Sequence, residues 1–357
     1  MLSEFEQPAL HLLTYSTCSF PEVYSSRLNS ILSTYRFNMT SPVFHNLNQT
    51  CLANLPSPEP SVRAFHRTLP DYAPTPLVSL PELANSIGVR AVLLKNETSR
   101  LGLPAFKILG ASWATARAVK KLLNVSEGQS FGLDDLKNAA QAAGLVLYAA
   151  SEGNHGRAVA RMASYLGISA RIFIPKMCDE AVKRKIESEG AEVVIWDGSY
   201  DDAVLGTKEA ATKHECGKGL LISDTALVEG DEVAQWIVDG YQTMFDEIEE
   251  QAAELRDLIT HVLTPVGVGS LCQGVVTHFK RPERKRNVDV ITVEPVVAAC
   301  LKASLEANKV TSVDAGYTIC SGMCCGTVYV YHGEIWWLRL LEITDKWFSD
   351  LQMLGQL

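Results

Sequence analysis

Short apolar runs alternate with longer amphipathic stretches along the chain from residue 89 onward. The apolar runs predict strands at 89–95, 145–150, 171–175, 191–196, 220–223, 261–266 and 288–294. The stretches between them predict helices at 107–123, 155–166, 180–189, 201–214, 233–248 and 271–279. Strands that are short and apolar throughout are buried on both faces, as in a parallel sheet with helices on either side. The pattern therefore predicts an α/β fold, whose ligands bind at the carboxyl ends of the strands.

The N-terminal part does not follow this pattern. Residues 1–38 are Ser-rich and are expected to form a poorly ordered extension before a second possible start at Met39. Residues 40–75 are rich in Pro, Ser and Asn and predict an irregular arm. The alternating pattern thus begins only after these two segments.

Composition narrows the class of protein. Of 357 residues, 47% are hydrophobic, which is enough for a substantial core. The formal net charge of −9 argues against binding nucleic acid, which requires Lys and Arg to neutralise phosphates. The nine cysteines are scattered without a CxxC pair, so no metal site is expected. No apolar run is long enough for a membrane span, and the scattered thiols favour the cytoplasm.

A glycine-rich loop follows the predicted strand at 261–266. Gly267, Val268, Gly269 and Ser270 precede a predicted helix, whose first N–H groups could hold a phosphate. Considered alone, this loop is as consistent with a plain strand–helix turn. It also resembles a nicotinamide-dinucleotide loop with Glu294 as the ribose acid, although Cys272 stands at the third glycine position.

A second loop of small and polar residues, 151–156 (SEGNHG), follows the predicted strand at 145–150. It is typical of a polar cradle at a strand end. Ser151 or Asn154 could equally act as the cap of the next helix, and both interpretations can hold at once.

Lys107 lies in a third loop among apolar residues, in the run AFKILG. Such a lysine usually extends its amine to water. If it is buried, its chemistry suits a lysine that forms a Schiff base. The residues themselves leave the two possibilities open, with solvent exposure the more common.

Taken in this order, the three loops resemble fold-type II pyridoxal-phosphate (PLP) enzymes, and more closely the diaminopropionate ammonia-lyase family. The resemblance covers residues 60–327 and includes the segments RLGLPAFK at 100–107, SYDD at 199–202, SDTAL at 223–227, GYQTM at 240–244, VEP at 293–295 and MCCGT at 323–327. It implies two open, mostly parallel sheets with flanking helices, as in tryptophan synthase β. It also implies a large PLP-binding domain from residues 39–107 and 211–357, and a small domain from 108–210.

The resemblance also implies roles for individual residues. Lys107 would carry PLP, Asn154 would bond its ring oxygen, and residues 267–270 would hold its phosphate. Glu152, where the family has Asp, and Asp224 would be catalytic carboxylates. The implied reaction removes ammonia from 2,3-diaminopropionate and yields pyruvate, with a serine or threonine dehydratase as the alternative. A homodimer acting on a small amino acid is expected, without nucleic-acid or membrane partners.

After Thr327 the resemblance stops, and the tail is expected to be truncated or divergent. Family members continue with a segment that places a partner beside the pyridine nitrogen of PLP. The chain is therefore expected to be an impaired catalyst, unless Cys324, Cys325 or Thr327 replaces that partner. Trp336 and the apolar residues that follow it are expected to cover the sheet or to form an exposed patch.

Overall fold

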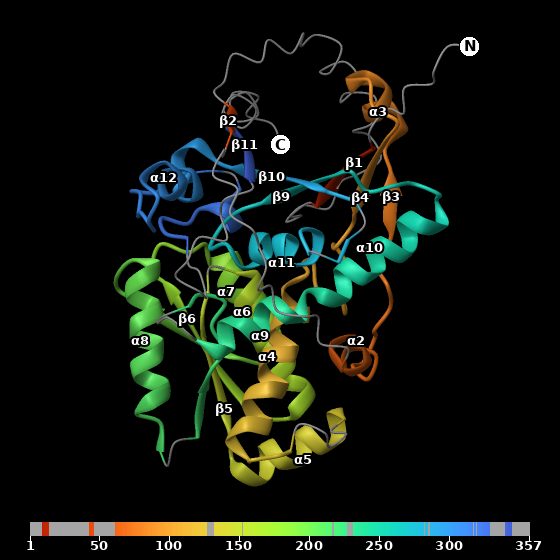
Figure 1. The fold of residues 1–357 in the computed structure, drawn as a ribbon. Coiled ribbons are helices and arrows are strands. Elements are labelled where there is room, and N and C mark those ends of the chain that lie inside the picture. Colours follow the sequence, from red (N-terminus) through yellow and green to blue (C-terminus); the bar gives the residue numbers. More distant parts are fainter. Residues whose placement is uncertain are drawn as a thin grey trace, which may run out of the picture.

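The computed structural model describes residues 9–13, 43–45, 61–126, 132–151, 153–215, 218–226, 231–281, 283–284, 286–316, 318, 320–328 and 340–344. These residues form two separate sheets with helices around them (Figure 1). The larger sheet has the strand order β2-β11-β10-β9-β1-β4-β3, and the smaller sheet the order β7-β6-β5-β8. The prediction of two open, mostly parallel sheets is therefore confirmed.

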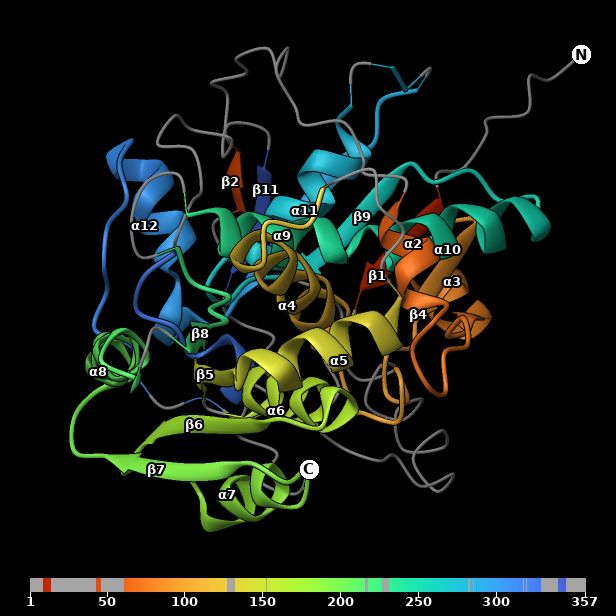
Figure 2. The ribbon, with the colours of Figure 1, turned by 90° about the horizontal axis from the view of Figure 1, so that it is seen from below.

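The smaller sheet is parallel throughout and is wound in two directions (Figure 2). From β5 the chain adds β6 and then β7 on one side, and it returns to place β8 on the other side. Because such crossovers are right-handed, α6 and α7 lie on one face and α8 on the opposite face. The strands are β5 (Val146–Ala150), β6 (Ser169–Pro175), β7 (Glu192–Trp196) and β8 (Gly219–Leu221); the helices are α6 (Asn154–Leu166), α7 (Glu180–Glu187) and α8 (Tyr200–Thr212).

The larger sheet contains four parallel pairings and one antiparallel pairing at each edge. Its strands are β1 (Ala9–Leu13), β2 (Val43–His45), β3 (Leu77–Ser79), β4 (Ala91–Lys95), β9 (His261–Pro265), β10 (Asp289–Glu294) and β11 (Leu340–Thr344). Residues 1–38 were expected to form a poorly ordered extension, yet Ala9–Leu13 forms β1, which pairs with both β4 and β9. In the tail, β11 pairs with β10 and β2, whereas Trp336 lies outside the described residues.

The remaining helices lie around and between the two sheets (Figure 1). They are α2 (Ser61–His66), α3 (Pro81–Ile87), α4 (Lys107–Leu122), α5 (Leu133–Ala143), α9 (Glu232–Gly240), α10 (Gln242–Glu254), α11 (Ser270–Phe279) and α12 (Cys300–Ala307), with 3-10 turns at Val296–Ala298 and Ser321–Met323. The helix predicted at 233–248 is divided at Tyr241 into α9 and α10. The proposed domain boundary at residue 211 falls within α8, and β8 beyond it pairs with β5 of the smaller sheet.

Two glycines allow α4 and α9 to cross in close contact. A Cβ atom added at Gly110 would lie 2.8 Å from the carbonyl oxygen of Ile237, and one added at Gly240 would lie 2.5 Å from that of Leu109. Real Cβ atoms do not approach a backbone this closely, so both positions require glycine. The contact fixes the start of α4, where Lys107 lies, against α9.

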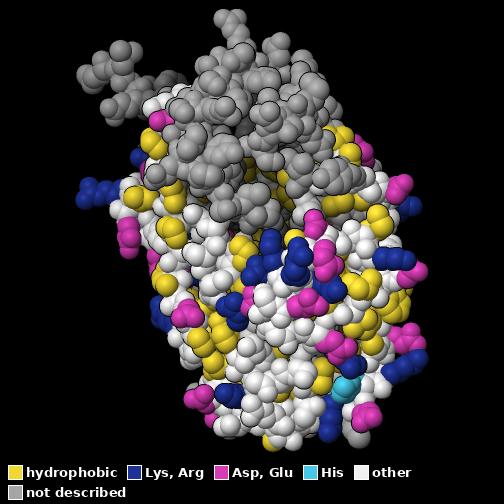
Figure 3. Space-filling model, turned by 180° about the vertical axis from the view of Figure 1, so that it is seen from behind, with side chains coloured by type: hydrophobic (Ala, Val, Ile, Leu, Met, Phe, Trp, Pro, Cys, Tyr) yellow, Lys and Arg dark blue, Asp and Glu magenta, His cyan; other side chains and the backbone are white. Residues whose placement is uncertain are grey.

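The surface carries charges of both signs. On the face in Figure 3, Lys and Arg side chains alternate with Asp and Glu side chains over the described surface. Among the described residues, no helix is both long and apolar enough to cross a membrane.

Candidate active site

Lys107 is the first residue of α4, and its side chain turns into the protein. Its Nζ atom lies 2.5 Å from Oδ2 of Asp224, and both side chains are buried. The amine therefore does not reach solvent as most lysines in apolar segments do. Of the two interpretations left open by the sequence, the structure supports a buried, charge-paired lysine.

Asp224 follows β8, at the point where the smaller sheet changes its direction of winding. Burial by itself would raise the pKa of this carboxyl, but His155 and Lys107 lie beside it and lower the pKa to about 2. The Nδ1 atom of His155 is 3.8 Å from Oδ2 of Asp224. Burial lowers the pKa of His155, and its Nε2 atom lies 2.8 Å from the carbonyl oxygen of Ile222. Asp224 is therefore ionised, and its negative charge lies beside the amine of Lys107.

The loop at 151–156 lies beside Asp224 because β5 and β8 are neighbouring strands. Ser151 Oγ accepts hydrogen bonds from the backbone N–H groups of Gly153 (2.9 Å) and Gly156 (2.8 Å). Gly153 is the N-cap residue of α6, and Ser151 contributes a capping hydrogen bond to its first turn, in line with one interpretation of this loop. Asn154 begins α6 and lines the same cavity as Lys107, whereas Glu152 lies outside the described residues.

The glycine-rich loop follows β9 and closes another side of the cavity. Gly269 has φ of 101°, a left-handed conformation that favours glycine, and α11 begins at Ser270. A Cβ atom at Gly267 would lie 2.8 Å from the carbonyl oxygen of Gly322 and 3.3 Å from Cys325 Sγ. The loop therefore packs closely against the 321–325 segment, with the N-terminal end of α11 facing the cavity.

These loops surround one cavity of about 240 Å³. Its walls include Lys107, Asn154, Asp224 and the four loop residues 267–270. It receives side chains from both sheets, as expected for a ligand site at the carboxyl ends of strands. The structure thus brings together every predicted site residue that it describes.

Tyr200 also lines this cavity and was missed by the sequence analysis. Burial raises its pKa well above the usual range, and the nearby Asp224 carboxylate raises it further. Its segment SYDD was noted only as part of the family resemblance. Ser199 and Asp202 form a reciprocal cap at the start of α8, and Tyr200 between them lines the cavity.

Glu294 does not have the role expected in a nicotinamide-binding enzyme. Its carboxylate is fully buried and accepts hydrogen bonds from the backbone N–H groups of Leu301 (2.8 Å) and Lys302 (3.0 Å). It therefore caps α12 instead of facing a ligand. This observation removes the main support for the oxidoreductase alternative.

The residues of the cavity fit PLP. The cofactor carries an aldehyde, which reacts with an amine such as that of Lys107, and a phosphate, which suits the N–H groups before α11. At Gly267, which lines the cavity, no Cβ atom fits beside the carbonyl oxygen of Gly322, so close packing against the 321–325 segment fixes the loop. The buried Nδ1 atom of His155 makes no hydrogen bond within the described residues, so it is available to a polar ligand group.

Comparison with known proteins agrees with this fit. The family model described as "Pyridoxal-phosphate dependent enzyme" matches residues 68–342. The chain belongs to this family. The match extends beyond Thr327, where the resemblance in sequence was expected to stop, and into β11.

Similar proteins narrow the relationship within the PLP-dependent enzyme family. The chain is 33% identical to the diaminopropionate ammonia-lyase of Escherichia coli K12 over 305 residues, which cover 85% of this chain and 73% of that one. A crystal structure of the Escherichia coli enzyme with an aminoacrylate–PLP azomethine intermediate matches with a TM-score of 0.71 and 31% identity, covering 84% of this chain and 76% of that one. A biosynthetic L-threonine dehydratase of Corynebacterium glutamicum is 27% identical, covering 65% of this chain and 46% of that one. The predicted resemblance to diaminopropionate ammonia-lyases is confirmed, and PLP is the cofactor of the family.

Proposed function

We propose that this protein is a PLP-dependent ammonia-lyase that converts 2,3-diaminopropionate and water into pyruvate and two molecules of ammonia. The observation that carries the proposal is the buried pair of Lys107 and Asp224, which opens on a cavity closed by the glycine-rich loop. The 33% identity to a diaminopropionate ammonia-lyase supplies the substrate.

The proposed roles of the residues follow from their positions. Lys107 binds the cofactor through its amine, and the loop 267–270 receives the phosphate at the start of α11. Asn154 lines the cavity at the start of α6, where its amide can bond an oxygen of the cofactor ring. When bound, PLP supplies an electron sink that stabilises negative charge at the α-carbon of an amino acid.

The protein must also move two protons, one from the α-carbon and one to the departing β-amino group. Lys107 and Glu152 are the candidates for removing the first. Asp224 is already ionised, and it positions the Lys107 amine by a hydrogen bond. Tyr200 keeps its phenolic proton because burial and Asp224 raise its pKa, so it can donate a hydrogen bond toward the substrate. Once the β-amino group has left, water hydrolyses the enamine to pyruvate and the second ammonia.

The assay separates this function from its neighbours. Purified protein loaded with PLP should show visible absorption, and borohydride reduction followed by peptide mapping should label Lys107. Release of ammonia and of the 2-oxo acid should then be measured with 2,3-diaminopropionate, L-serine and L-threonine; the first two would give pyruvate and the third 2-oxobutyrate. Label on another lysine would refute the site, whereas faster turnover of serine or threonine would make the protein a dehydratase.

We also infer that the working form is a homodimer in the cytoplasm that takes a small amino acid as substrate. The relative that is 33% identical is a diaminopropionate ammonia-lyase, and its name supports a small amino acid as the substrate. Light scattering of the purified PLP-loaded protein would test the dimer, and fractionation of its source cells would test the location.

A further inference from the structure

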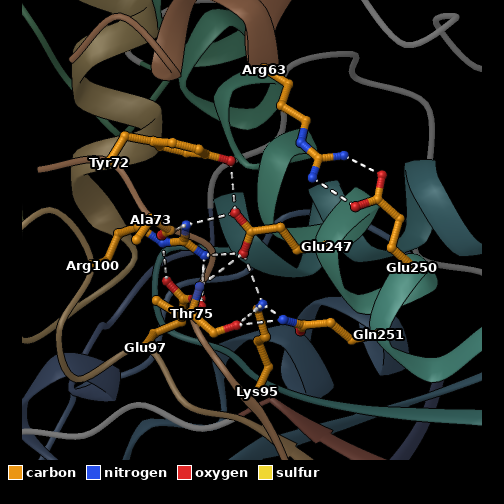
Figure 4. A network of polar contacts seen from close by, with 10 residues as sticks. All are labelled: Arg63, Tyr72, Ala73, Thr75, Lys95, Glu97, Arg100, Glu247, Glu250 and Gln251. Atoms are coloured by element: carbon orange, nitrogen blue, oxygen red, sulfur yellow. Dashed lines mark hydrogen bonds and ion pairs between the residues drawn. The ribbon is translucent and has the colours of Figure 1, made fainter. Parts of the chain in front are cut away.

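A second group of buried charges lies outside the cavity, beside the loop that leads to Lys107 (Figure 4). It consists of Lys95, Glu97, Arg100 and Glu247, and is called here the Arg100 cluster. The exposed fraction of these side chains is between 0 and 4%. Two cations and two anions give the cluster no net charge, so burial leaves no uncompensated ion.

Arg100 is the centre of the cluster and is held on two sides. Its Nε and Nη2 atoms donate to the carboxylate of Glu97 at 2.8 and 2.7 Å. Its Nη1 and Nη2 atoms donate to the carboxylate of Glu247 at 2.8 and 2.7 Å. Paired hydrogen bonds of this kind fix the orientation as well as the distance of the partners.

Lys95 and Thr75 complete the cluster. The Nζ atom of Lys95 donates to Glu247 Oε2 at 2.8 Å and to the carbonyl oxygen of Thr75 at 2.6 Å. The hydroxyl of Thr75 donates to Glu97 Oε1 at 2.5 Å and accepts from Arg100 Nη2 at 2.8 Å. The charged groups are therefore matched from several directions within the protein.

The position of the cluster connects it to the active site. Residues 96–106 run from the end of β4 to the residue before Lys107, and Arg100 lies in this loop. Helix α10 provides Glu247, which holds Arg100 in the middle of the loop. The ring of Tyr241, immediately before α10, lies 4.9 Å from the ring of Phe106 at the end of the loop. The segment before Lys107 is thus held at its middle by α10 and at its end by the residue before that helix.

The middle of this loop is also held, by the smaller sheet's side of the molecule. Arg161 of α6 donates from Nη1 to the carbonyl oxygen of Leu101 at 3.1 Å. Leu101 and Gly102 have φ of 50° and 72°, a local conformation that is unfavourable for Leu. Contacts on both sides are therefore needed to keep the loop in this shape.

We propose that Arg100 and Glu247 are positioning residues, which set the place of the Lys107 amine in the cavity by fixing the loop 96–106 on α10. This inference rests on the proposed role of Lys107 in binding PLP. Stability alone is a poor reason for such a cluster, because apolar residues of similar size often replace a buried ion pair without loss of stability. A misplacement of about 1 Å, however, can lower the rate or binding of a reacting group about 100-fold.

The double variant Arg100→Met with Glu247→Met tests positioning separately from stability. It removes one cation and one anion, and Lys95 and Glu97 remain to balance each other. We expect its apoprotein to melt near the wild-type temperature. We expect its apparent Kd for PLP, measured from the visible absorption of the lysine-bound cofactor, to rise at least about tenfold. Borohydride labelling of Lys107 at a fixed PLP concentration should fall in parallel.

Wild-type PLP affinity and labelling in the folded double variant would overturn the proposal. Arg100→Lys provides a second test if the double variant does not fold, because it keeps the charge but cannot make the paired hydrogen bonds. We expect weaker PLP binding there too, and an unchanged Kd would equally contradict positioning. Glu250→Gln is the matched control, since Glu250 lies on α10 and pairs with Arg63 at the surface (Figure 4); it should bind PLP as the wild type does. Failure of the wild type itself to label Lys107 would instead refute the proposed function.

Discussion

The Arg100 cluster and the site around Lys107 both bury a lysine against a carboxylate, but they differ in their relation to the cavity. Lys95 has three acceptors at 2.6–3.0 Å, from Thr75, Glu247 and Gln251. Lys107 bonds to Asp224 and lines the cavity, where the Nδ1 atom of nearby His155 makes no hydrogen bond within the described residues. Buried charges that are matched from several sides hold a structure in one arrangement, whereas a buried polar atom such as His155 Nδ1 beside a cavity can receive a ligand group.

The largest expected effect comes from replacing each of the two buried lysines in a separate variant. Lys107→Ala should abolish both PLP attachment and pyruvate formation, because the reacting amine is lost, while the protein remains folded. Lys95→Met should keep a reactive Lys107 but lose stability, because Glu247 and Glu97 are left with one cation between them. Visible absorption and thermal melting of the two variants provide the measurement. If both variants lost the same property, the distinction between the two sites would be wrong.

Glu152 tests the chemistry proposed for the Lys107 site, although this residue lies outside the described residues. Glu152→Gln should keep PLP attached and lower turnover by about 10²–10⁴-fold, the range for loss of a general acid or base. Glu152→Asp, which restores the family residue, should retain or raise turnover of 2,3-diaminopropionate. Steady-state pyruvate release from the three proteins decides the matter. Turnover equal to wild type in Glu152→Gln would exclude an acid–base role for this residue.

Glu247→Gln tests the structural half of the comparison, because it removes one anion from the Arg100 cluster. It leaves Arg100 and Lys95 buried with Glu97 as the remaining anion, so the free energy of unfolding should fall by about 3 kcal/mol. Urea denaturation of the apoprotein measures this loss. The Glu250→Gln control, at an exposed pair, should change it by less than about 1 kcal/mol. Equal losses in the two variants would mean that burial does not increase the contribution of the Arg100 cluster to stability.

The buried side chain of His66 allows a test of how the free energy of unfolding depends on pH. Burial lowers the pKa of His66 from 6.5 to about 3, and its Nδ1 and Nε2 atoms lie 2.7 Å from Thr243 Oγ1 and 3.0 Å from the carbonyl oxygen of Leu109. Below pH 6.5 the His66 side chain is protonated in the unfolded chain, whereas in the folded protein it stays neutral down to about pH 3. The contribution of His66 to stability is therefore complete above pH 6.5 and is lost as the pH falls toward 3.

His66→Gln should consequently flatten the decline in stability below pH 6.5 by up to one proton, or about 1.4 kcal/mol per pH unit. Urea midpoints of wild type and variant between pH 7 and pH 4.5 provide the comparison. Parallel slopes would mean that His66 is protonated in the folded protein.

The smallest expected effect is at the start of α8. Ser199→Ala removes the cap shared with Asp202 and should cost about 1 kcal/mol of stability. Tyr200 follows this cap and lines the cavity, so visible absorption of the bound cofactor should be recorded beside the melting curve. A large change in PLP affinity would show that the cap serves the site and not only the helix.

Much of the fold could be predicted from the sequence because its strands are apolar and its helices amphipathic. Each of the seven predicted strands is present, with ends that differ by a few residues. The break at Tyr241 was missed because the apolar pattern of α9 continues into α10, although Gly240 ends α9. The strand at Ala9–Leu13 was missed because it lies in a Ser-rich segment, and α5 because its apolar face is small.

The site was predicted as far as its residues lie in short segments with a distinctive sequence. Lys107, Asn154 and residues 267–270 occupy loops with unusual composition, so a local pattern was enough. Tyr200 was not recognisable, because only the winding of the smaller sheet brings the start of α8 to the cavity. The Arg100 cluster was equally hidden, since Arg100 and Glu247 are 147 positions apart and each resembles a surface charge in its own segment.

The glycine contact between α4 and α9 has a consequence for genetic tolerance. The smallest possible replacement at Gly110 or Gly240, a single methyl group, would have to displace a neighbouring backbone, and overpacking of this kind costs about 1–3 kcal/mol. The displaced element would be the helix that begins with Lys107. In a library of all single substitutions selected for activity, these two codons should therefore be depleted nearly as strongly as Lys107 itself, although neither glycine lines the cavity.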